Sequence, residues 1–229
     1  MISTTFDTFM IVSDMTASCE RVERKSFEPY STPEMQVAAG GFMSSAVSEE
    51  PRSHRGLLDA GLKLFLRHGL RKTSMEAIAA EAQVAKATAY ARYPNKTAVF
   101  AAVVEDVLTR LVDDAMAAAA AEQGPAAAIE RSMETKFGRL YDLVHTSEAG
   151  AELLAASNEL TAEIVARAHA RYVTHLAKLL VASGLPDRRV APALAEVLDS
   201  AAEGVIARAP DRAEAERRIR LLVDRFVTR

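Results

Sequence analysis

The stretch that decides the fold runs from residue 73 to residue 100 and reads TSMEAIAAEAQVAKATAYARYPNKTAVF. Thr73 and Glu76 fit the S/T-x-x-E capping box, in which the first side chain caps a helix, and they predict a short helix that ends near residue 82. A second short helix is predicted from Lys86 to Arg92. Two short helices joined by a turn of three or four residues indicate a helix-turn-helix, whose second helix enters the major groove of DNA.

The second of these helices carries side chains suited to DNA. Lys86 and Arg92 can neutralise phosphates or bond to guanine, and the hydroxyls of Thr88 and Tyr90 can bond to phosphate oxygens. The backbone amides that open the next helix, at Lys96, also attract phosphate. The spacing therefore favours double-stranded DNA as the partner.

The charge distribution agrees with this interpretation. Residues 51–96 hold nine basic and three acidic residues, whereas the whole chain of 229 residues has a formal net charge of −3. A short basic block in an acidic chain is typical of a nucleic-acid surface, and its alternative is a solvated helix face with a chance excess of charge.

Working outward, the chain is rich in Ala, Leu and charged residues, and no alternating β-branched run is present, so the sequence predicts an all-α fold. A first helix is expected from Pro51, with Gly69 as its C-cap, and a long helix from Lys96 to about residue 121, capped by Asn95. Further helices are expected at about 125–145, 148–156, 159–183, 190–208 and 211–228.

The first 48 residues mix Ser, Thr, Gly, Pro and acids without sustained periodicity, and we expect residues 1–48 to be a disordered tail. Gly40-Gly41 precedes Met43 as a translated ribosome-binding sequence would precede a start codon. We therefore expect translation to start at Met43, with a start at Met1 as the alternative.

Composition argues against several classes of protein. A lone cysteine, Cys19, cannot form an intrachain disulfide, and the N-terminus lacks a basic signal-peptide region, so we expect a cytoplasmic protein. Charged residues interrupt every apolar stretch, so we expect no membrane span. No HExxH, glycine-rich phosphate loop or G-x-S-x-G is present, so we expect no metal, no cofactor and no enzyme active site.

Residues 73–100 resemble the TetR family of bacterial transcription regulators, whose pattern is T-[TS]-x-x-x-I-A-x-x-A-G-V-S-x-x-T-L-Y-x-x-F-x-[SN]-K-x-x-L. The matching residues are Thr73, Ser74, Ile78, Ala79, Ala82, Val84, Thr88, Tyr90, Asn95 and Lys96. Gln83 replaces the turn glycine, Ala89 replaces a leucine, and Ala91-Arg92-Tyr93 replaces the usual aromatic or histidine followed by Phe. A left-handed Gln83 would cost on the order of 1 kcal/mol.

The resemblance implies three domains or segments and their roles. Residues 49–96 are expected to form a three-helix DNA-binding domain, and residues 97–229 a helical bundle for dimerisation and ligand sensing, after the tail 1–48. The residues expected at DNA are Thr73, Lys86, Ala87, Thr88, Tyr90, Arg92 and Lys96.

The resemblance also implies a small hydrophobic ligand and a homodimer. The candidate ligand residues, polar or aromatic groups on otherwise apolar helix faces, are Met133, Phe137, Tyr141, Tyr172 and His175. The candidate dimer residues form stripes on the last two helices: Leu194, Val197, Leu198, Ala201, Val205, Ile219, Leu222 and Phe226. A buried core would give the same stripes.

The sequence thus predicts a repressor that binds a palindromic operator as a homodimer and is released by a small apolar ligand. One alternative is a regulator of the same fold that needs no ligand, or that activates. The other is an all-helical ligand-binding or scaffold protein whose basic hairpin is incidental.

Overall fold

The computed structural model describes residues 50–145, 161–184 and 188–227, and over these residues it contains helices and no strand, which confirms the all-α prediction. The elements are α2 (Glu50–Lys72), α3 (Met75–Glu81), α4 (Lys86–Arg92), α5 (Lys96–Ala120), α6 (Pro125–His145), α8 (Ala162–Ala182), the 3-10 turn η2 (Arg188–Val190), α9 (Ala191–Arg208) and α10 (Arg212–Val227). The tail 1–48 with Met43, and the helix predicted at 148–156, lie outside the described residues.

α2 ends its regular winding at Gly69, whose φ of 74° lies in the left-handed region that favours glycine. The hydroxyl of Thr73 donates to the carbonyl of Gly69 at 2.8 Å, and Thr73 is buried. The cap of α3 is therefore Ser74, whose side chain accepts from the amide of Ala77. The prediction that Thr73 caps this helix is wrong by one residue, because the break in α2 draws its hydroxyl inward.

The helices α2 to α5 share one apolar cluster, which we call the N-terminal cluster. Phe65 of α2 meets Phe100 of α5 edge to face, with ring centroids 5.4 Å apart. A Cβ added at Gly61 would lie 3.0 Å from a methyl of Val99, so this glycine allows α2 to pack closely on α5. Ile78 contributes a fully buried side chain from α3.

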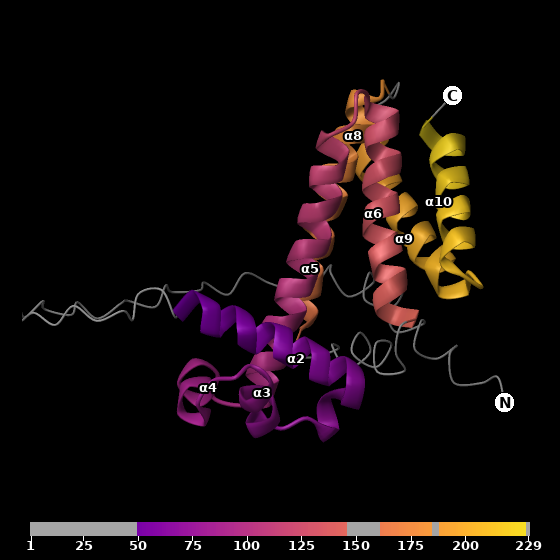
Figure 1. Ribbon diagram of the computed structural model, residues 1–229. Helices are drawn as coiled ribbons and strands as arrows, with labels where there is room; N and C mark the ends of the chain where they lie inside the picture. The colour runs from indigo at the N-terminus through magenta and orange to yellow at the C-terminus, as the bar shows by residue number, and fades with distance from the viewer. Residues whose placement is uncertain (1–49, 146–160, 185–187, 228–229) are drawn as a thin grey trace, which may run out of the picture. The chain divides into compact units, whose positions relative to one another are not determined.

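A second apolar cluster, the C-terminal cluster, lies among α5, α6, α8, α9 and α10. α5 belongs to both clusters: Val103 and Val104 pack in the first, Val112 and Ala115 in the second. Figure 1 shows α5 continuing from the small N-terminal helices into the bundle. The predicted domain boundary at residue 96 coincides with the start of this shared helix and stays a prediction.

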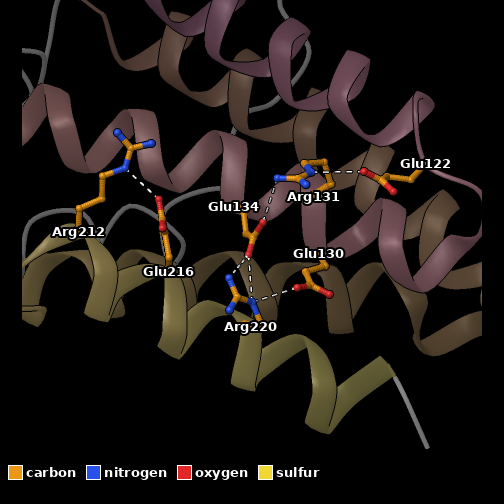
Figure 2. Close-up of polar contacts among 7 residues, drawn as sticks. All are labelled: Glu122, Glu130, Arg131, Glu134, Arg212, Glu216 and Arg220. Atoms are coloured by element: carbon orange, nitrogen blue, oxygen red, sulfur yellow. Dashed lines mark hydrogen bonds and ion pairs between the residues drawn. The ribbon is translucent and has the colours of Figure 1, made fainter.

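α10 packs on α6 through an apolar face and a polar one. Its buried residues are Ala215, Ile219 and Val223. On the polar side, Arg220 donates to Glu134 at 2.8 Å and to Glu130 at 3.1 Å, and Figure 2 shows Glu134 between Arg220 and Arg131. Exposed ion pairs contribute little to stability singly, so burial of the apolar face stabilises this packing more than the ion pairs do.

The turn between α3 and α4 contains Gln83 with a φ of 56°, the only positive φ outside glycine among the described residues. The residue that stands in place of the family's turn glycine is therefore left-handed, the case in which the substitution is costly. The turn is held by the amides of Gln83 and Val84, which donate to the carbonyls of Ala80 and Ala79.

We expect Gln83→Gly to stabilise the protein by about 0.5–1 kcal/mol, because glycine adopts a left-handed conformation without the clash of a Cβ. Thermal unfolding followed by circular dichroism measures the effect. Gln83→Ala is the matched control and should give no gain, since alanine keeps the Cβ. A glycine variant that melts below the wild type would show that the turn is not strained.

Candidate nucleic-acid interface

α4 presents almost its whole surface to solvent. Lys86, Thr88, Tyr90 and Arg92 are exposed, as is Ala87, whereas Ala89 is fully buried in the N-terminal cluster. The small side chain at 89, in place of a leucine, still anchors the helix. The structure therefore brings five of the seven predicted DNA residues together on one exposed helix of seven residues.

Glu76 of α3 organises the start of this surface. The ammonium of Lys86 lies 2.6 Å from the Glu76 carboxylate, and the Tyr90 hydroxyl donates to the same oxygen at 3.3 Å. The hydrogen bond from Lys86 lowers the pKa of Glu76, and Glu76 in turn raises the pKa of Lys86. Sequence reasoning assigned Glu76 to a capping box, yet its carboxylate holds two side chains of the neighbouring helix.

Arg92, at the far end of α4, is linked to α2 through His54. The Arg92 Nε donates to His54 Nδ1 at 3.4 Å, and the Tyr93 hydroxyl lies 3.0 Å from the same nitrogen. The rings of His54 and Tyr93 stack with centroids 6.1 Å apart. Sequence reasoning missed His54, because no motif joins it to a helix 38 residues later.

Lys96, which was expected at DNA, bonds to backbone carbonyls in this structure. Its ammonium donates to the carbonyls of Leu70, Arg71 and Thr73 at 2.9, 3.0 and 3.0 Å. A lysine has three N–H donors, so these bonds use all of them. In this structure Lys96 closes the end of α2 rather than offering a free charge.

The first turn of α5 nevertheless keeps the features of an anion site. Asn95 caps it, accepting from the amide of Ala98 at 2.9 Å, as predicted. Arg71 and Lys72 are exposed and lie in the last turn of α2. Lys96 donates a hydrogen bond to the backbone carbonyl of Arg71. These two basic residues lie just before the short segment that leads from α2 to α3. Their charge is the only feature of the sequence that could have indicated them as candidates for a DNA contact. Thr73 has a buried hydroxyl with a partner and faces away from this surface.

Residues 57–103 match the family model described as bacterial regulatory proteins, tetR family. The predicted TetR resemblance is confirmed. The matched segment covers the helix-turn-helix with α4 and the first part of α5. No curated protein gave a match.

Solved structures of TetR-type regulators are similar over most of the chain. A putative TetR-family regulator from Mesorhizobium loti is 20% identical with a TM-score of 0.62, covering 78% of this chain and 96% of its own. A TetR-like regulator from Rhodococcus sp. RHA1 is 24% identical with a TM-score of 0.57, covering 77% and 96%. A putative regulator from Pseudomonas aeruginosa is 21% identical with a TM-score of 0.60, covering 78% and 92%. The chain has the fold of these regulators.

The predicted ligand residues gather in the C-terminal cluster of this TetR fold. Met133, Phe137 and Tyr172 are fully buried, Tyr141 is nearly so, and His175 is half-buried. Phe137 and Tyr172 meet edge to face at 6.4 Å. The buried ones belong to one apolar cluster, so a ligand among them would have to displace side chains.

A cleft of about 250 Å³ lies elsewhere, between α5 and α8. Its apolar lining includes Leu108, Val112 and Ile164, and Arg167 and Arg171 stand at its edge. The described residues contain no helix long and apolar enough to cross a membrane.

Buried charges lie beside the predicted ligand residues. The Lys136 ammonium bonds to Asp199 and stands 4.1 Å from the centroid of the Tyr172 ring. Asp199 above all, with Glu196, raises the pKa of His169 to about 9, and burial raises the pKa of Tyr172. Sequence reasoning missed Lys136 and Asp199, because each stands on a helix with many charges.

The predicted dimer residues divide into two groups. Leu198 and Ile219 are fully buried in the C-terminal cluster of the single chain. Val197 and Phe226 are 53% and 47% exposed. The remaining four are half-buried: Leu194, Ala201, Val205 and Leu222.

We expect Lys96→Met to lower the free energy of unfolding by about 1–3 kcal/mol, because three carbonyls lose a charged donor and methionine keeps the aliphatic chain. Chemical denaturation measures this loss. Lys72→Met is the control, since Lys72 is an exposed lysine at the same helix end, and it should leave stability unchanged. Equal stability of Lys96→Met and the wild type would mean that the three bonds contribute nothing.

Proposed function

We propose that the protein is a transcriptional repressor that binds a palindromic DNA operator as a homodimer, with α4 in the major groove. The observation that carries the proposal is the exposed face of α4, where Lys86, Thr88, Tyr90 and Arg92 all face solvent while Ala89 anchors the helix. Lysine and arginine are the residues that most often bond to guanine, and hydroxyls position the helix on phosphates.

The contacts of Glu76 with Lys86 and Tyr90 must be exchanged for contacts with DNA when the operator binds. Both side chains are held by one carboxylate in the free protein, so phosphate or a base edge must replace Glu76 as their partner. The exchange costs little, since the pair is exposed and solvent screens it. In the free protein, the contacts with Glu76 hold the Lys86 and Tyr90 side chains on the surface that DNA would meet.

We expect Lys86→Ala to weaken operator binding and Glu76→Gln to tighten it severalfold at low salt. The first change removes a cation at DNA, and the second removes the carboxylate that competes with phosphate for that cation. Gel shifts with the DNA upstream of the chain's own gene, against a random duplex of equal length, measure both. Arg139→Ala, a change at an exposed arginine of α6, is the matched control and should bind as the wild type does.

Equal affinity of the wild type for upstream and random DNA at physiological salt would overturn specific binding and favour a helical scaffold protein. Opposite shifts for the two variants are the signature of the proposed exchange. A Glu76→Gln variant that binds less tightly would instead mean that Glu76 itself positions α4.

We place the dimer interface on the outward faces of α9 and α10. Val197 and Phe226 are large apolar side chains left exposed in the single chain, and Val205 and Leu222 are half-buried beside the C-terminal cluster. Gly204 has no apolar neighbour against the position of a Cβ, so it lies at a surface where another helix can approach. Leu198 and Ile219 support this face from within.

We expect Val197→Glu to give folded monomers with weak operator binding, because a charge in a two-fold interface is buried twice. Val197 is exposed in the monomer, so the change should leave its own fold intact. Light scattering gives the mass, and far-ultraviolet circular dichroism checks the fold. A variant that remains dimeric would place the interface elsewhere.

We propose that a small apolar ligand releases the DNA by moving α5. This helix starts beside the helix-turn-helix and also lines the cleft against α8. Val112 belongs to both the cleft and the cluster of Phe137 and Tyr172, so a ligand seated there would reach the predicted residues by displacing few side chains. A regulator of similar fold from Saccharomonospora viridis, 14% identical with a TM-score of 0.57, was solved in complex with choline.

A further inference from the structure

Three side chains with metal-binding chemistry meet between α8 and α9. One ligand atom each of His169, Asp199 and Glu203 lies within 4.8 Å of the other two. Asp199 and Glu203 are four residues apart on α9, so one helix face presents both carboxylates. His169 comes from α8, and Asp199 is fully buried.

One buried carboxylate oxygen in this group lacks a hydrogen-bond donor. Asp199 Oδ2 accepts no hydrogen bond, although the residue has 0% exposure. His169 Nδ1 lies 3.1 Å from that oxygen, but its N–H is not aligned for a hydrogen bond. Glu203 has no hydrogen bond or ion pair in the part of the chain that the structure describes. A buried acceptor without a hydrogen-bond donor is rare, so Asp199 Oδ2 offers a lone pair that a cation could take.

We propose that His169, Asp199 and Glu203 bind a divalent transition-metal ion such as Zn²⁺. Imidazole nitrogen and carboxylate oxygen are ligands that Zn²⁺ takes at about 2.0–2.2 Å. Two such ligands on one ion are then roughly 3.0–3.4 Å apart in octahedral or tetrahedral geometry. The 3.1 Å between His169 Nδ1 and Asp199 Oδ2 lies in this range.

Neighbouring residues hold the proposed ligands in place, as hydrogen-bonding residues around metal ligands commonly do. The other ring nitrogen of His169, Nε2, lies 2.9 Å from Glu196, a carboxylate–histidine pair that orients Nδ1 toward the ion. The Lys136 ammonium holds the other oxygen of Asp199 and leaves Oδ2 free.

Such an ion would tie α8 to α9, the two helices that supply its ligands. α8 is also joined to α5 by ion pairs of Arg167 with Glu105, at 3.1 Å, and of Arg171 with Asp113, at 2.5 Å. The binding site itself does not depend on the proposed DNA binding, and its test uses no DNA.

The test uses the full chain freed of metal by a chelator and of any affinity-tag histidines. Equilibrium dialysis with Zn²⁺ and the visible ligand-field absorption of Co²⁺ measure binding. We expect one ion per chain, and Glu203→Gln and His169→Gln should each weaken binding at least about tenfold. Glu163→Gln, at an exposed acid on α8, is the matched control and should bind as the wild type does.

Thermal unfolding distinguishes the loss of a metal-binding side chain from the loss of the fold. Among the described residues Glu203 makes no hydrogen bond or ion pair, so metal-free Glu203→Gln should melt as the metal-free wild type does. Only the wild type should gain stability on adding Zn²⁺. The proposal is overturned by an absence of saturable binding. It is equally overturned if Glu203→Gln binds with wild-type affinity, which would place the ion elsewhere and leave these residues as an ion-pair network.

Discussion

The ammonium of Lys96 joins the break in α2 to the start of α5, and this joint fixes how the chain leads from α2 into α3 and on toward the exposed helix α4. Its three carbonyl partners lie on the segment that leads from α2 into α3. Helix ends leave carbonyls without partners, and a charged donor that satisfies three of them at once fixes the direction in which the chain leaves the helix. Gly61 adds a second constraint, because it allows α2 to lie close against Val99.

α4 is too short to be stable by itself. A helix of seven residues is marginal in water, and this one has no side-chain cap at its start. It is held by burial of Ala89 and by the contacts of Glu76 and His54 with its polar side chains. The same contacts set the geometry of the surface, so the stability of α4 and its proposed task come from the same neighbours.

The helix ends were predictable because they depend on local chemistry. Asn95 caps α5 and Gly69 breaks α2 where short-range rules predict. Gln83, which stands in place of the family's turn glycine, is left-handed, a conformation that was considered from the sequence but not predicted. The bonds of Thr73 and Lys96 to backbone carbonyls were not predicted, because those carbonyls are exposed by the break in α2 and no sequence pattern indicates the pairing. The all-helical fold and the surface of α4 could be read from the sequence, whereas these inward contacts could not.

In the C-terminal bundle, periodicity could not separate core from interface, since both give apolar stripes: Leu198 is buried and Val197, one residue before it, is exposed. The group of His169, Asp199 and Glu203 could not be found from the sequence, because 29 residues separate the histidine from the first carboxylate. Only the packing of α8 on α9 brings them together.

Hydroxyl-radical footprinting of the wild-type protein on the DNA upstream of its own gene tests the central claim most directly. If α4 of each protomer enters the major groove, two protected regions related by a two-fold axis should appear, centred about one helical turn, or a multiple of it, apart. Lys86→Ala should lose both regions together at the same protein concentration. Protection without two-fold symmetry, or an unchanged pattern in Lys86→Ala, would contradict the assignment of α4 as the element that meets DNA.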